Sequence, residues 1–147
     1  MCSSCNSTQK IYDIVGYGTF ITQKYWKDKN VQLCQVLNHI RVLPEGNWFP
    51  FVLYQEGSSF WALLFSVNEL ELNHLDTYEG VDAGLYTRKK IEVLLKSKMK
   101  KNAFIYIPTK ETIKKYDLAP QIDLNDRWKE KIKEYPEIVR RFPELVQ

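Results

Sequence analysis

A short helix that ends in an acid and a glycine constrains this chain more than any other segment. Asn68 and Glu71 have the spacing of a capping box, in which each side chain bonds the other residue's backbone N–H. We therefore predict a helix from residue 69 to residue 78 or 79, which Gly80 then stops.

The acid in the last turn, Glu79, is predicted to point toward the protein interior. At about 100° per residue it lies within about 60° of Leu72 and Leu75, which form the apolar stripe of the helix. Burial and the helix dipole both disfavour the charged carboxylate, so we expect a raised pKa suited to proton transfer. The alternative is a salt-bridged or frayed glutamate at a helix end.

A glycine-containing turn is the second feature. Residues Ile11 to Val15 predict a strand that leads into Gly16-Tyr17-Gly18-Thr19-Phe20. Gly18 lets the backbone approach a ligand, and successive amide N–H groups in such a turn can bind a carboxylate or a developing oxyanion. The turn lacks the third glycine and the acid of a dinucleotide site, and on its own an ordinary structural turn explains it better.

Three segments occur together in order: Tyr17-Gly18-Thr19-Phe20, then Leu75-Asp76-x-x-Glu79-Gly80, then Tyr86-x-Arg88. In this combination the chain resembles the gamma-glutamylcyclotransferase family, including its gamma-glutamylamine cyclotransferase branch. The likeness extends over roughly residues 11 to 107, and the segment from Thr109 onward is outside it.

The resemblance implies an α+β fold built on a small curved or barrel-like mixed β-sheet with few helices. It also implies an enzyme without cofactor or metal that converts a small gamma-glutamyl substrate to 5-oxoproline. By this resemblance the catalytic acid is Glu79, and the substrate-binding residues are Tyr17, Gly18, Thr19, Phe20 and Tyr86. Two positions depart from the family: Phe20 replaces the usual Leu, and Gly16 replaces a larger residue, which bears on the shape of the pocket.

Several roles stay open at this point. The turn amides could hold either the glutamyl carboxylate or the carbonyl oxygen, and Tyr86 could bond the substrate, orient Glu79 or simply pack at an interface. Arg88 is expected to support the fold, with Asp76 as its ion-pair partner. The sequence does not identify the leaving amine, although we expect Trp48 and the C-terminal segment to line its pocket.

Other segments predict the remaining elements. Expected strands cover residues 31–43, 49–54, 60–67, 86–95 and 103–107, with a turn at 56–59. The unbroken apolar run from Phe60 to Phe65 indicates a strand buried on both faces. A C-terminal helix is expected to be capped by Asp123, ended by Pro136, and striped by Leu124, Trp128, Ile132 and Tyr135.

Length and composition agree with one enzyme-sized domain over residues 10–147, preceded by a flexible tail over 1–9. The 147 residues are 44% hydrophobic, enough for one core, and contain no run of 18 apolar residues that could span a bilayer. The polar start carries no secretory pattern, and three cysteines do not suggest a disulfide framework. We therefore expect a cytoplasmic protein.

A metal site is not expected. Cys2 and Cys5 have metal-like spacing, but only Cys34, His39 and His74 could complete a closed zinc site. Cys34 and His39 are separated by an odd number in a predicted strand, so without a bulge they face opposite sides of the sheet.

Two binding functions compete with the enzyme. The first is a nucleic-acid surface formed by basic runs, namely Lys96, Lys98, Lys100 and Lys101, then Lys110, Lys114 and Lys115. A net charge of +3, with 18 acids spread through the chain, makes a nucleic-acid partner an unfavoured choice. The second is a non-catalytic domain on the same fold that binds a small carboxylate in the glycine turn.

Overall fold

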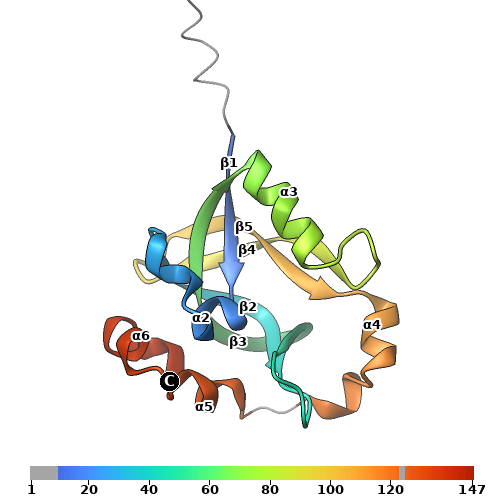
Figure 1. Ribbon diagram of the computed structural model, residues 1–147. Coiled ribbons are helices and arrows are strands. Elements are labelled where there is room, and N and C mark those ends of the chain that lie inside the picture. Colours follow the sequence, from blue (N-terminus) through green and yellow to red (C-terminus); the bar gives the residue numbers. More distant parts are fainter. Residues whose placement is uncertain (1–9, 123–124) are drawn as a thin grey trace, which may run out of the picture.

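Five strands form a closed barrel in the computed structural model, which describes residues 10–122 and 125–147 (Figure 1). Around the barrel the strands follow the order β1-β3-β2-β4-β5. Their bounds are β1 Ile11–Gly16, β2 Gln32–Val42, β3 Phe51–Asn68, β4 Tyr86–Leu95 and β5 Lys100–Pro108. Neighbouring strands are antiparallel except β1 and β5, which pair in parallel at Ile14 and Phe104. The predicted barrel-like mixed sheet with few helices is confirmed.

The predicted division of residues 49–67 into two strands is wrong, because β3 runs through the expected turn without a break. Opposite this segment, β2 carries a bulge between Leu37 and His39. At the bulge Asn38 has a left-handed φ of 58°, and its side-chain oxygen accepts a hydrogen bond of 3.1 Å from the Gly57 N–H. The glycine that predicted a turn therefore lets two paired strands bend together around the barrel. The apolar half of β3 is buried as expected.

The predicted helix after β3 is confirmed as α3, Glu69–Tyr78. Both hydrogen bonds of the capping box are present: the Glu71 N–H donates to Asn68 Oδ1 at 2.8 Å, and the Asn68 N–H donates to Glu71 Oε1 at 2.9 Å. At the other end Gly80 has φ 72° and its N–H bonds the Thr77 carbonyl, so glycine ends the helix in a left-handed conformation. These two ends fix where Glu79 lies.

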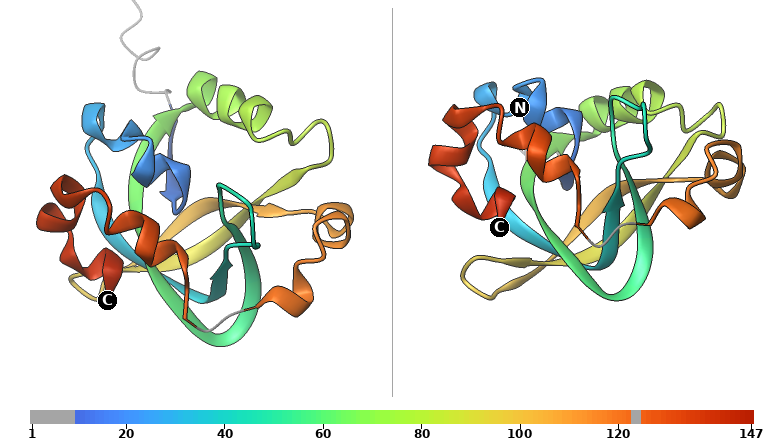
Figure 2. Two further views of the ribbon diagram at one scale, coloured as in Figure 1. Left: turned by 60° about the horizontal axis from the view of Figure 1, so that its bottom comes forward. Right: turned by 90° about the horizontal axis from the view of Figure 1, so that it is seen from below.

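Short helical segments cover the barrel on two sides (Figures 1 and 2). They are α2 Thr19–Thr22, η1 Tyr25–Asp28, α4 Lys110–Lys115, η2 Ala119–Gln121, α5 Trp128–Ile132, α6 Pro136–Arg141 and η3 Pro143–Val146. The C-terminal elements α5, α6 and η3 lie beside α2, whereas α4 lies on the other side of the barrel (Figure 2). One hydrophobic cluster joins Ile21 and Trp26 to Trp128, Ile132 and Ile138.

The C-terminal prediction is partly confirmed. Trp128 and Ile132 are buried on one face of α5, as the stripe predicted. Pro136 separates two helices and also begins the second, since proline is well tolerated at the first helical position. The proposed cap Asp123, its neighbour Leu124 and the tail over residues 1–9 lie outside the described residues. Across the described part of the chain, no helix is long and apolar enough to cross a membrane.

The capping box gives a first stability prediction. Replacing Asn68 by Ala removes the acceptor for the Glu71 N–H, so the free energy of unfolding should fall by about 1 kcal/mol. The matched control is Asn73→Ala, an exposed position within the same helix, which should be neutral or slightly stabilising. Urea denaturation of the three proteins measures the difference, and equal effects of both substitutions would contradict the capping role.

Candidate active site

A cavity of about 690 Å³ opens where the end of β1, the end of α3 and the start of β4 meet. It is lined by every site residue that the sequence predicted, namely Tyr17, Gly18, Thr19, Phe20, Glu79 and Tyr86. These residues come from segments far apart in the chain, so the barrel brings the three recognised segments together. The structure brings these residues together, and the chemical role of each remains a prediction.

Glu79 is a partly buried carboxylate in the cavity lining, whereas Asp28, the other carboxylate there among the described residues, is exposed. Glu79 lies at the C-terminal cap of α3, where its N–H bonds the Leu75 carbonyl at 2.8 Å. Within the described residues no hydrogen bond or ion pair reaches its side chain, so the salt-bridged alternative does not apply. Burial disfavours the charged form and raises the pKa of Glu79 from 4.5 to about 7. Such a carboxyl group can both take up and release a proton near neutral pH.

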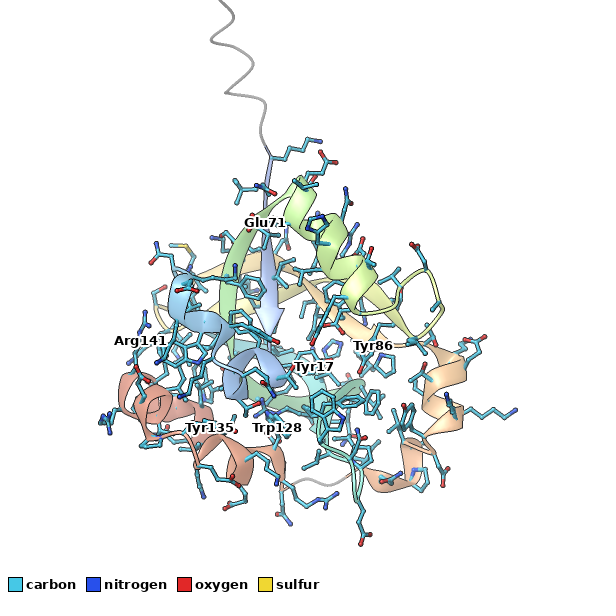
Figure 3. The ribbon with its side chains drawn as sticks, viewed as in Figure 1. Tyr17, Glu71, Tyr86, Trp128, Tyr135 and Arg141 are labelled. Carbon is cyan, nitrogen blue, oxygen red and sulfur yellow. The ribbon has the colours of Figure 1, made fainter. Side chains whose placement is uncertain are left out.

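Two tyrosines lie next to Glu79. Burial, and then the nearby Glu79 charge, raise the pKa of Tyr86, and the pKa of Tyr17 is also raised mainly by burial. Both hydroxyls are therefore neutral and keep a proton to donate. Figure 3 shows the two residues close together near the centre of the molecule. Tyr86 stacks on Phe51 with ring centroids 5.8 Å apart, whereas the Tyr17 hydroxyl donates to the Tyr106 carbonyl at 2.7 Å.

The glycine turn connects β1 to α2. Gly18 precedes the helix, and its carbonyl accepts the Ile21 N–H at 2.9 Å. The first amides of a helix have no partner within it, which leaves the N–H groups of Gly18, Thr19 and Phe20 available at the cavity. A Cβ on Gly18 would lie 3.0 Å from the Pro50 ring. Pro50, rather than ligand approach alone, therefore explains why a glycine stands here.

The two departures from the family pattern form one structural feature. A Cβ on Gly16 would lie only 2.4 Å from a ring carbon of Phe20. The Phe20 ring occupies that space and stacks on Phe65, with centroids 4.2 Å apart and planes at 7°. The larger side chain at position 20 thus fills the volume that a side chain at position 16 would need.

The outer part of the cavity is aromatic. Trp48, Tyr25 and Tyr78 line it and are largely exposed, and Lys24 and Lys29 lie beside them. The expectation for Trp48 is confirmed, but the expectation for the C-terminal segment is wrong. Among the described residues the lining ends at Tyr106, and α5 and α6 instead contribute Trp128, Ile132 and Ile138 to the hydrophobic cluster that contains Ile21.

Arg88 supports the fold, as predicted. Its guanidinium donates to Asp76 at 2.8 Å, and the second Asp76 oxygen accepts the Tyr106 hydroxyl at 2.7 Å. The same guanidinium lies 4.8 Å from the Phe104 ring centre. This network fixes the end of α3 against β4 and β5 and leaves Glu79 outside it.

Strand alternation places Cys34 and His39 on opposite faces of the sheet only if β2 has no bulge. The bulge in β2 lies between Cys34 and His39, so the two side chains do not follow simple alternation. Both residues are buried, and the His39 ring nitrogen Nδ1 lies 2.8 Å from the Leu37 carbonyl. Within residues 10–122 and 125–147 no three His, Cys, Asp or Glu side chains gather as metal ligands, and Cys2 and Cys5 are outside those ranges.

Sequence reasoning missed a buried ion pair behind the glycine turn. Arg41 on β2 and Asp126, just before α5, form a salt bridge, and Arg41 also donates to the Tyr17 carbonyl at 2.6 Å. One signal was present, because an arginine between Ile40 and Val42 interrupts a strand of apolar residues. Nothing in the sequence indicated Asp126 as its partner.

This α+β barrel, with an acid, two tyrosines and a glycine turn around one cavity, matches a known class of protein. The sequence matches the family described as gamma-glutamyl cyclotransferase, AIG2-like, over residues 14–130, and the chain belongs to this family. Among proteins with curated descriptions, none matches the sequence.

Solved structures have the same fold. An Arabidopsis thaliana protein determined in solution has a TM-score of 0.66 and 16% identity, with 92% of this chain and 83% of that chain covered. A structure titled gamma-glutamyl cyclotransferase has a TM-score of 0.61 and 15% identity, with 85% of this chain and 99% of that chain covered. A mouse AIG2-like protein has a TM-score of 0.51 and 18% identity, with 66% of this chain and 76% of that chain covered. At these identities the likeness concerns the fold.

The contact between positions 16 and 20 gives a second prediction. Gly16→Ala forces a methyl group into the Phe20 ring and should lower the free energy of unfolding by about 1–3 kcal/mol. In a Phe20→Leu background the same substitution should cost less than half as much, because the smaller side chain leaves room. A double-mutant cycle by chemical denaturation measures this coupling, and additive effects would show that the two positions are independent.

The raised pKa of Glu79 predicts how stability depends on pH. The pKa of Glu79 in the folded protein, about 7, exceeds its ordinary value of 4.5. Between these pH values the folded protein therefore binds more protons than the unfolded protein does. The contribution of Glu79 to stability is full below pH 4.5 and falls as the pH rises through 7. At about 1.4 kcal/mol per pKa unit, Glu79→Gln should gain up to about 3 kcal/mol over the wild type between pH 4.5 and 8.

Chemical denaturation at several pH values tests this trend. The exposed Glu69→Gln substitution on the same helix serves as the control and should show no such gain. A stability difference between wild type and Glu79→Gln that stays flat with pH would mean that Glu79 titrates as an ordinary exposed glutamate.

Proposed function

We propose that this protein is a cyclotransferase that cleaves a gamma-glutamyl amide and releases 5-oxoproline and an amine. The observation that carries the proposal is the Glu79 carboxyl group, which is unpaired within the described residues, has a pKa of about 7 and shares its cavity with the glycine turn. Membership of the gamma-glutamyl cyclotransferase, AIG2-like family supports the same conclusion.

The substrate supplies its own nucleophile. The free α-amine of a gamma-glutamyl compound attacks the γ-carbonyl carbon, closes a five-membered ring and expels the amine that the carbonyl carried. The α-ammonium group loses two protons in forming the ring amide, and the leaving amine gains two to depart as an ammonium ion. The reaction therefore consumes no water and needs no oxidant, which agrees with catalysis without a cofactor or metal.

Glu79 performs the proton transfers in this proposal. Its ionised carboxylate takes a proton from the attacking nitrogen and the resulting acid gives it to the leaving nitrogen, and a second such transfer completes the exchange of two protons. A group with a pKa of about 7 is populated in both forms near neutral pH, so neither step is strongly disfavoured. The cavity must also fold the substrate so that its amine approaches the carbonyl, which the surrounding aromatic walls favour by restricting its conformations.

The glycine turn and Tyr86 supply polar contacts. Amide N–H groups of residues 18–20 can donate to the oxygen that becomes negatively charged when the ring closes. Tyr86 remains protonated and lies close enough to Glu79 for the Glu79 charge to raise the pKa of its hydroxyl. This hydroxyl can therefore orient the carboxylate or bond the substrate. The Tyr17 hydroxyl is already bonded to Tyr106, which leaves the Tyr17 backbone as its contribution.

Nucleic-acid binding is the weaker alternative. Three lysines of the β4–β5 hairpin are in ion pairs: Lys96 with Glu144, Lys100 with Glu92, and Lys101 with Asp13. Because these acids offset part of the basic charge, the surface attracts a phosphate backbone less strongly. Binding of a small carboxylate without turnover differs from the proposal only in catalysis, so an assay separates them.

The direct test is incubation with a panel of gamma-glutamyl compounds, namely glutathione, gamma-glutamyl amino acids and lysine-linked gamma-glutamyl amines, while 5-oxoproline is measured. Glu79→Gln should lower the rate by about 10² to 10⁴, because it removes the titrating group with little change in volume. Glu69→Gln should keep full activity. Near-normal turnover by Glu79→Gln would show that Glu79 is structural.

Substrate analogues test the intramolecular attack. Acetylating the α-amine removes the nucleophile, and an α-linked isomer cannot close the ring, so neither should yield 5-oxoproline. Activity should survive a strong chelator. Release of free glutamate would indicate hydrolysis, and salt-sensitive binding of RNA or DNA without turnover would favour the nucleic-acid alternative.

A further inference from the structure

Arg41 and Asp126 are the most deeply buried pair of charges in the described structure. Arg41 is 1% exposed and Asp126 is 7% exposed. The Arg41 Nε–H and Nη2–H groups donate to the Asp126 carboxylate at 3.0 Å and 2.8 Å. The guanidinium also lies 4.8 Å from the centre of the Phe60 ring. Asp126 comes from the C-terminal segment, so this pair joins that segment to β2.

Stability alone is a poor reason for such a pair. Moving two charges out of water costs free energy that their attraction often fails to recover, and apolar residues of similar size frequently stabilise a core as well or better. The remaining Nη1–H of Arg41 suggests another reason, because it donates to the Tyr17 carbonyl at 2.6 Å. Neither Arg41 nor Asp126 lines the cavity, so any effect on the reaction must pass through that carbonyl.

The Tyr17 carbonyl belongs to the same peptide group as the Gly18 N–H. In a trans peptide the C=O and N–H bonds point in opposite directions, so the Gly18 N–H points away from Arg41. Gly18 lines the cavity, and its N–H has no hydrogen-bond partner among the described residues. A charged donor on the carbonyl polarises the peptide group and makes its N–H a stronger donor.

We propose that Arg41, held by Asp126, is a positioning residue that fixes the Tyr17–Gly18 peptide and strengthens the Gly18 N–H as the donor to the reacting carbonyl oxygen. This inference rests on the proposed cyclotransferase function. It gives the C-terminal segment a part in catalysis although the described residues of that segment do not line the cavity. Because the oxygen gains charge only as the ring closes, loss of the donor's strength should lower kcat more than it raises KM.

The test removes both charges together. A single Asp126→Asn substitution leaves a buried guanidinium without its counter-charge and should lower the Tm strongly. The double variant Arg41→Met with Asp126→Asn leaves no buried charge, and Asn suits the left-handed φ of 45° at position 126. Its Tm should therefore recover relative to the single variant. The control is Lys96→Gln with Glu144→Gln, which removes another ion pair of the C-terminal segment whose two residues do not line the cavity.

We expect the double variant to lose at least tenfold in kcat with KM changed less than threefold, while the control keeps its activity. Arg41→Lys keeps the charge but should also lower kcat. One ammonium group cannot reproduce the planar set of donors that reaches both Asp126 and the Tyr17 carbonyl. Normal kcat in a folded double variant, or a loss confined to KM, would overturn the proposal.

A second readout does not depend on turnover. The backbone ¹⁵N resonance of Gly18 reports hydrogen bonding at the preceding carbonyl, so it should move in the double variant and stay in place in the control. If the wild type releases no 5-oxoproline, the proposed function fails, but this resonance still tests the link from Arg41 to Gly18. An unmoved Gly18 resonance would overturn that link whatever the activity.

Discussion

The burial of an unpaired carboxylate at the end of α3 is the constraint on which the site depends. A glutamate in this position is costly when ionised, and nothing in the described structure neutralises it. The helix that carries it is correspondingly well fixed, by a capping box at one end and by Gly80 at the other. Asp76, three residues before Glu79, adds the ion pair with Arg88. These contacts hold the acid where its pKa is raised.

Asp126, which is buried, and Glu79, which is partly buried, differ in their partners. Asp126 is fully engaged by Arg41, which gives a rigid support behind the glycine turn. Glu79 has neighbours, Tyr17 and Tyr86, but no charged partner among the described residues. An acid held by a guanidinium stabilises a geometry, whereas an unpaired acid is available to exchange a proton with a substrate. The difference in partners separates a structural role from the chemical role we propose.

Local signals in the sequence predicted the parts of the site that depend on one segment. The capping box and Gly80 gave the bounds of α3, and the apolar stripe gave the direction of Glu79. The glycine turn was recognisable because Gly16 and Gly18 directly follow a predicted strand, a pattern typical of a turn. The barrel itself came from resemblance, since no local pattern indicates that β1 and β5 close the sheet.

Features that depend on two distant segments could not be predicted in this way. The pairing of Arg41 with Asp126 joins residues 85 positions apart, and a lone arginine in a strand does not identify its partner. The turn expected at residues 56–59 was wrong because Gly57 serves a bend that the bulge at Asn38 on the partner strand completes. Gly16 and Phe20 looked like two unrelated departures until the contact between them was visible.

The central claim is that Glu79 titrates near neutral pH because burial disfavours its charge. The most direct measurement is an NMR titration of the protein labelled with ¹³C at glutamate side-chain carboxyl groups, with Glu79→Gln to assign the resonance. We predict one carboxyl resonance with a midpoint of about pH 7 that is missing from the variant. A Glu79 resonance that titrates near pH 4.5 would contradict the account, because the carboxylate would then be an ordinary ionised acid with no proton to give at neutral pH.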